Sequence, residues 1–71
     1  MNYTGTVYKF NNNYGFIQPD DRKGPRKDVL FDKKIFAAKI GDRVKYSWVE
    51  KEGRRFAEEM EIIEKKHRVY G

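Results

Sequence analysis

The 71-residue sequence contains no cysteine, two prolines and no long apolar run. Without cysteine, the chain can form neither a disulfide nor a thiolate zinc site, and the lack of disulfides in so small a domain favours a reducing compartment. A membrane-spanning helix needs about 18 or more apolar residues, and MNYTGTVYKF at the start lacks the profile of a signal peptide. We therefore expect a soluble, cytoplasmic protein that does not contact a membrane.

Residues able to carry catalysis are equally scarce. The single histidine, His67, falls near the C-terminus, and the single serine, Ser47, lies in an expected strand without a partner base. Asp20 and Asp21 are followed by two cations, which is more typical of a solvated turn than of a metal or acid–base pair. No glycine-rich phosphate loop precedes a helix. We expect no enzyme, no catalytic residue, no metal and no cofactor.

The charge is strongly uneven along the chain. The formal net charge is +5, and residues 22–45 carry nine Lys or Arg against three Asp. A basic segment on a small domain with a pI near 9.6 is typical of a polyanion binder. Lysine and arginine also keep small domains soluble, so composition alone leaves both interpretations open.

Apolar and polar residues alternate through most of the chain, and this period of two predicts strands rather than helices. Asn11–Asn13 and Gly53 mark two hairpin turns, Pro19 is expected to end a strand, and residues 19–27 read as a loop. The expected strands cover residues 3–10, 14–18, 28–32, 43–50 and 55–63. Their expected inward side chains are Ile17, Val29, Phe31, Val44, Tyr46 and Trp48.

Two segments fit the strand pattern less well. Residues 33–42 lack alternation and are expected to form a helical turn before Gly41. RFAEEMEIIEKK is rich in helix formers, and Glu61 with Lys65 has helical spacing. The preceding strand needs a partner, however, which favours a fifth strand. Residues 64–71 are expected to form a basic tail.

Five short strands in about 70 residues predict an all-β, five-stranded barrel of the oligonucleotide/oligosaccharide-binding (OB) type, a single domain over residues 1–63. Closing the sheet removes edges that would otherwise pair with other chains.

Several short motifs, in this order, resemble the cold-shock domain family. They are GTVYKFN (5–11), YGFI (14–17), DVLF (28–31), IGDRVKY (40–46) and Ala57. The resemblance covers about residues 4–63. It implies a Greek-key barrel that binds single-stranded RNA or DNA with low sequence selectivity, through aromatic motifs on adjacent strands, and it implies an RNA-chaperone role.

Strand parity places Tyr14 and Phe16 on one face and Ile17 on the other. In the family the first face binds nucleic acid, because aromatic rings stack on any base and cations attract phosphates. The alternative makes Tyr14 and Phe16 core residues. The expected nucleic-acid-binding residues are Tyr8, Lys9, Tyr14, Phe16, Lys27, Leu30, Lys33, Arg54 and Phe56, with Arg22, Lys23 and Arg26 as further phosphate contacts.

The sequence also departs from the family pattern. Lys9 occupies the usual tryptophan position, and Leu30, Asp32 and Lys33 stand where Phe, His and Phe are usual. The Arg54–Arg55 pair and Phe56 are candidates to compensate. We expect weaker and more salt-sensitive binding than a complete aromatic motif gives. A protein partner or structured RNA is the alternative, since a carboxylate at position 32 repels phosphates.

Overall fold

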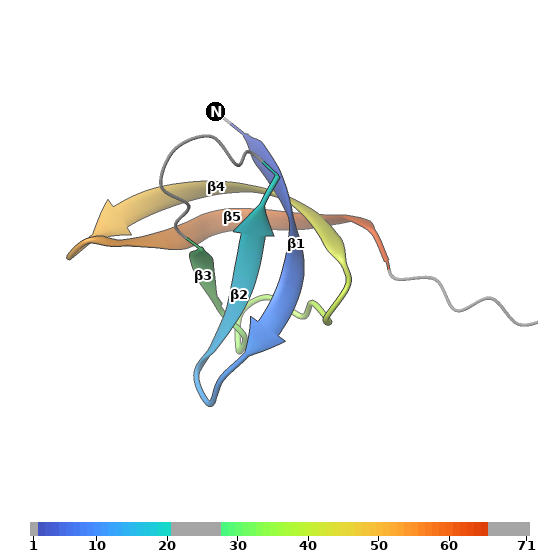
Figure 1. Ribbon diagram of the computed structural model, residues 1–71, viewed down its shortest axis with the longest axis horizontal. Coiled ribbons are helices and arrows are strands. Elements are labelled where there is room, and N and C mark those ends of the chain that lie inside the picture. The colour runs from blue at the N-terminus through green and yellow to red at the C-terminus, as the bar shows by residue number, and fades with distance from the viewer. Residues whose placement is uncertain (1, 21–27, 66–71) are drawn as a thin grey trace, which may run out of the picture.

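The computed structural model describes residues 2–20 and 28–65, and Lys27 with the other predicted contacts of the 21–27 segment, Arg22, Lys23 and Arg26, lies outside them. Five strands form one closed, mixed sheet in the order β1-β2-β3-β5-β4 (Figure 1). All neighbouring strands are antiparallel except β3 and β5, which are parallel. The strands are β1 Tyr3–Phe10, β2 Tyr14–Pro19, β3 Val29–Asp32, β4 Arg43–Lys51 and β5 Arg54–Glu64.

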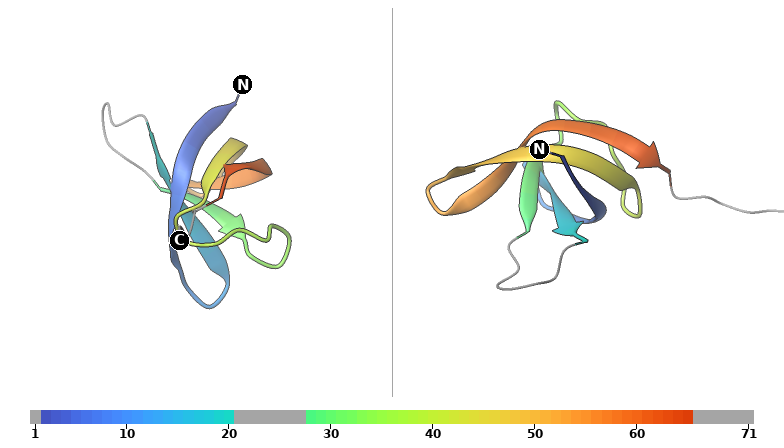
Figure 2. Two further views of the ribbon diagram at one scale, coloured as in Figure 1. Left: turned by 90° about the vertical axis from the view of Figure 1, so that its right-hand side faces the viewer. Right: turned by 90° about the horizontal axis from the view of Figure 1, so that it is seen from above.

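The two C-terminal strands are the longest and form a curved hairpin across one side of the molecule, with β1, β2 and β3 crossing beneath it (Figure 2). This hairpin turns at Glu52 and Gly53, both with positive φ. Nine residue pairs join β4 to β5, whereas β3 meets β5 only at Val29–Arg55 and Leu30–Phe56. The pairing of β3 with β5 therefore contains the fewest residue pairs of any two neighbouring strands in the closed sheet.

The core lies inside the closed sheet and is formed by inward side chains of β1 to β4, with partly buried side chains of β5 packed against them. Its buried members are Val7, Ile17, Val29, Phe31, Val44 and Tyr46. Burying an aliphatic or aromatic side chain of this size stabilises a fold by about 1.5–3 kcal/mol each. The predicted inward residues are confirmed, although Trp48 packs against the core while only half-buried. Trp48 lies where β4 has passed the end of its pairing with β1, so fewer strands cover it.

A β-bulge interrupts the alternation of β1. Val7 is paired with Ile17, but the next pair is Lys9 with Phe16, so Tyr8 is the extra residue. Val7 and Phe10 therefore both face inward, and the Phe10 ring meets Phe31 edge-on at 5.9 Å. Such a bulge bends the strand and redirects its side chains.

Gly15 allows the core aromatic ring of Phe31 to lie directly on the β2 backbone. A Cβ atom built at residue 15 would collide with the Phe31 ring. The motif YGFI thus needs its glycine for packing, with the aromatic residues on either side of it free to face outward.

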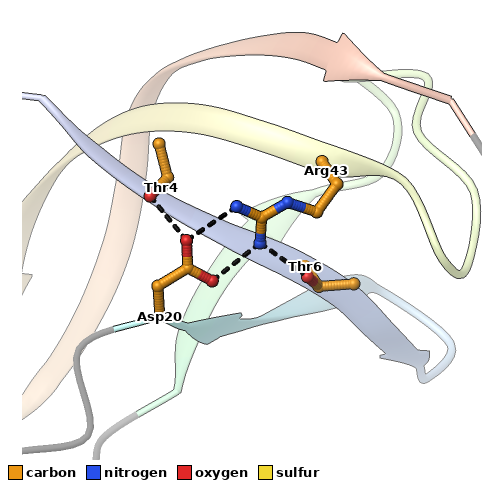
Figure 3. Close-up of polar contacts among 4 residues, drawn as sticks. All are labelled: Thr4, Thr6, Asp20 and Arg43. Carbon is orange, nitrogen blue, oxygen red and sulfur yellow. Dashed lines mark hydrogen bonds and ion pairs between the residues drawn. The ribbon is translucent and has the colours of Figure 1, made fainter.

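The ends of three strands are joined by a polar cluster (Figure 3). The Arg43 guanidinium donates to both carboxylate oxygens of Asp20 at 2.7 and 2.8 Å and to the Thr6 hydroxyl at 3.0 Å. The Thr4 hydroxyl donates to Asp20. The hydrogen bond to Asp20 raises the pKa of Arg43. Because both side chains are more than a third exposed, solvent weakens this ion pair.

Several predicted boundaries shift by a residue or more. β2 includes Pro19. The next residue, Asp20, donates its amide to the Thr4 carbonyl of β1. Because successive N–H groups of a strand point to opposite sides, the N–H that Pro19 lacks would point away from β1, and its absence does not interrupt this pairing. β3 begins at Val29, and β5 extends to Glu64.

The helical turn predicted within residues 33–42 is confirmed as a single turn directly after β3. The amides of Ile35 and Phe36 both donate to the Asp32 carbonyl. Within the described parts of the chain, no helix has the length and apolar character needed to span a membrane.

Candidate nucleic-acid interface

One row of outward side chains crosses four neighbouring strands. Lys9 is paired with Phe16, Phe16 with Leu30, and Leu30 with Phe56. Paired residues in a sheet share a face, so this row lies on the side opposite the core. The predicted inward position of Ile17 is confirmed, since it is fully buried, and Phe16 lies on the opposite face, where it is half-buried.

Two tyrosines flank this row. The Tyr8 ring meets Phe16 edge-on at 6.5 Å, and the Tyr14 ring lies 5.9 Å from Phe56. The Tyr8 hydroxyl donates to the Asp28 carboxylate, which fixes the ring across β2. We call the set Tyr8, Lys9, Tyr14, Phe16, Leu30 and Phe56 the aromatic face.

The bulge in β1 explains how Lys9 joins the aromatic face. Because Tyr8 is the extra residue, both Tyr8 and Lys9 face outward. The Lys9 ammonium lies 4.6 Å from the Phe16 ring centroid and 5.8 Å from that of Tyr8. Such cation–π contacts are worth about 0.5–1 kcal/mol at exposed sites, so Lys9 covers Phe16 only weakly.

The members of the aromatic face differ in accessibility. Tyr8 is 38% exposed, and Tyr14, Phe16 and Phe56 are half-buried. Leu30 is only 6% exposed. Leu30 therefore forms the floor between the rings and offers little surface of its own for a base.

Two shallow grooves meet at Leu30. The larger, of about 430 Å³, includes Tyr14, Phe56, Asp32 and Lys51 in its lining. The smaller, of about 340 Å³, is bordered by Phe16, Asp28, Arg54 and Arg55. The aromatic face thus has Leu30 at its centre, with the larger groove on one side and the smaller groove on the other.

The charged rim is mixed. Arg54 and Lys51 are exposed at the tip of the β4–β5 hairpin. The Lys33 ammonium donates to the Asn11 carbonyl at 3.0 Å, so it lies at the other hairpin, joining β1 to β2. Asp32 and Glu58 border the larger groove.

Arg55 borders the smaller groove together with Arg54, but its guanidinium is engaged elsewhere. It is paired with the inward residue Val29, and its guanidinium lies 4.2 Å from the Trp48 ring centroid. Tyr3 approaches Trp48 from the other side, with ring centroids 5.8 Å apart. Of the Arg54–Arg55 pair, Arg54 is therefore the member whose guanidinium is not held against Trp48.

The sequence prediction missed two parts of this surface. Lys51, the last residue of β4, borders the larger groove, and the Asp28 carboxylate accepts a hydrogen bond from the Tyr8 hydroxyl. The spacing of Val7 and Phe10, with two non-core residues between them, could have signalled the bulge, because two inward residues three apart do not fit strict alternation.

The hairpin before Tyr14 is built by asparagine. The Asn11 side-chain oxygen accepts from the amides of Asn13 and Tyr14 at 2.8 and 2.6 Å, as asparagine commonly does in turns. This contact fixes the point at which β2 begins, and so determines which β2 side chains join the aromatic face.

Across residues 2–20 and 28–65, no group of three histidine or acidic side chains is placed to hold a metal ion. No protein-family model matches the chain, and no curated protein matches it.

Proposed function

We propose that the chain is an OB-fold domain of the cold-shock type that binds single-stranded RNA or DNA at the aromatic face, as a binding protein and not an enzyme. The strand order, with β4 returning to β1 and a parallel β3–β5 pair, supports the OB assignment. The observation that carries the function is the outward row Lys9, Phe16, Leu30 and Phe56, which runs across four strands.

The arrangement of rings supports single strands rather than duplexes. Stacking on an aromatic ring is worth about 1–3 kcal/mol per base and requires an unpaired base with a free face. Displacing Lys9 from Phe16 costs about 0.5–1 kcal/mol, so stacking outweighs it. The displaced ammonium is then free to bind a phosphate.

Stacking alone does not give tight binding. The rings group as Tyr8 with Phe16 and Tyr14 with Phe56, which suits about two bases and gives about 2–6 kcal/mol. Micromolar affinity needs about 8 kcal/mol. Phosphate contacts must supply the rest, and the cations that we propose for them are Lys9, Lys33, Lys51 and Arg54.

Titrating the protein with single-stranded and duplex oligonucleotides of equal charge, over a range of salt concentrations, tests the proposal. We expect tighter binding to the single strand. With about four phosphates engaged, log K should fall with log salt at a slope of about −3, since each contact to a single strand contributes about 0.7. Equal affinity for the duplex, or a slope near zero, would contradict it.

A further inference from the structure

The larger groove beside the aromatic face has apolar walls and one well-fixed carboxylate. Tyr14, Leu30 and Phe56 contribute apolar surface, and Asp32 lies at the end of β3 opposite Tyr14. The volume of about 430 Å³ lies within the range of about 300–1,000 Å³ that is usual for small-molecule sites. A single base is small enough to enter this groove and matches its apolar walls.

Asp32 is held by its neighbours and still has capacity to accept hydrogen bonds. Its Oδ1 accepts from the Lys34 amide at 2.8 Å, and its carbonyl accepts from the amides of Ile35 and Phe36. Its Oδ2 has no hydrogen bond or ion pair within the part of the chain that the structure describes. A carboxylate offers about four acceptor positions and can accept two donors side by side, so Asp32 presents a rigid double acceptor.

The edges of the four bases differ in how they suit a double acceptor. Guanine presents two adjacent donors, N1–H and the exocyclic amino group. Adenine and cytosine each place one amino group beside an acceptor nitrogen, and uracil places one N–H between two carbonyl oxygens. Single-stranded bases are commonly read along these edges. Only guanine can donate to both carboxylate oxygens without bringing an acceptor against one of them.

We propose that Asp32 makes the larger groove a guanine-selecting subsite within an otherwise unselective single-stranded nucleic-acid interface, an inference that rests on the proposed function. The base lies against Tyr14 and Phe56 while its N1–H and amino group donate to Asp32. The carboxylate repels phosphates wherever they pass, so it lowers affinity for every sequence. A guanine offsets this repulsion, and the other bases do not.

The ligand side of the test uses short oligouridines that carry one central guanine, adenine, cytosine or inosine. Inosine lacks the amino group of guanine but keeps N1–H. We expect the guanine oligonucleotide to bind about tenfold more tightly than the adenine, cytosine and all-uridine ones. The inosine oligonucleotide should bind only about threefold more tightly than those three. Equal affinity for all of them would overturn the guanine subsite while leaving the single-strand function supported. Binding of none would overturn both.

The protein side uses Asp32→Asn with Glu58→Gln as the matched control. Asparagine keeps an oxygen for the Lys34 amide but replaces the second acceptor with a donor. We expect D32N to lose the guanine preference and to bind uridine more tightly. Glu58 borders the same groove, so E58Q should raise affinity for all oligonucleotides and leave the preference intact. A preference that survives in D32N, or disappears equally in E58Q, would overturn the role of Asp32. If D32N does not fold, the inosine series still decides.

Discussion

Replacing Phe16 by leucine or alanine tests whether a ring on the aromatic face stacks on a base. Phe16 is the central ring of the outward row, between Lys9 on β1 and Leu30 on β3. Leucine keeps an apolar side chain over the floor of the face but removes the flat π surface. Alanine removes both.

The size of the effect follows from two opposing contributions. A stacked base is worth about 1–3 kcal/mol, and releasing Lys9 from Phe16 costs about 0.5–1 kcal/mol in the wild type. In the variants this release is no longer needed, so the net loss of binding free energy should be about 0.5–2 kcal/mol. That loss corresponds to a dissociation constant about two- to thirty-fold higher.

The measurement is fluorescence anisotropy of a labelled oligouridine, with urea unfolding of each variant alongside it. Ile63→Ala is the control, because Ile63 is an apolar side chain on β5, 48% exposed, and borders neither groove. We expect F16L to unfold near the wild-type urea concentration and to bind more weakly, and I63A to bind as the wild type does. Wild-type affinity in both folded Phe16 variants would refute stacking at this position.

Three further predictions concern stability. Gly15→Ala should lower the urea midpoint by an amount equivalent to about 1–3 kcal/mol, because the new methyl group collides with the Phe31 ring; an unchanged midpoint would contradict this packing. Arg43→Met should cost about 1 kcal/mol or less, since the pair with Asp20 is partly exposed, and thermal unfolding should show a smaller difference at high salt. Burial raises the pKa of Tyr46 from 10.0 to about 12, so the neutral phenol stabilises the fold fully below pH 10 and this contribution falls as the pH rises toward 12. The urea midpoint of the wild type should therefore decrease between pH 10 and 12 by more than that of Tyr46→Phe. Equal decreases in the two proteins would argue against this contribution of Tyr46.

The strand positions and most inward residues could be predicted from the sequence, because alternation is a local signal. The turn residues Asn11 and Gly53 mark hairpins that the structure confirms. The choice of a strand for the helix-prone segment 55–63 is also confirmed, since pairing with β4 outweighs intrinsic helix propensity there. Nucleic-acid binding by this surface stays a prediction.

What the sequence could not show depends on contacts between strands. The spacing of Val7 and Phe10 is compatible with a bulge, but only the register of β1 against β2 places it at Tyr8, because parity counted along one strand assumes unbroken pairing. Trp48 is less buried than predicted, since β1 begins at Tyr3, opposite Tyr46, and does not pair with β4 beyond it. The Arg55 guanidinium lies against Trp48 of the neighbouring strand β4, a contact that the Arg54–Arg55 motif alone does not indicate. Each of these depends on which strand lies alongside and where that strand stops.

The short pairing between β3 and β5 gives a bound strand a mechanical role. The aromatic face straddles this seam, with Phe16 and Leu30 on one side and Phe56 on the other. A ligand that contacts residues on both strands would hold β3 and β5 together where the closed sheet has its fewest residue pairs. A ligand that binds only the native state, at a free concentration one hundred times its dissociation constant, adds about 2.7 kcal/mol to the free energy of unfolding. Here hydrogen exchange should slow first at the amides of residues 29–31 and 55–57, ahead of the long hairpin that already holds itself together.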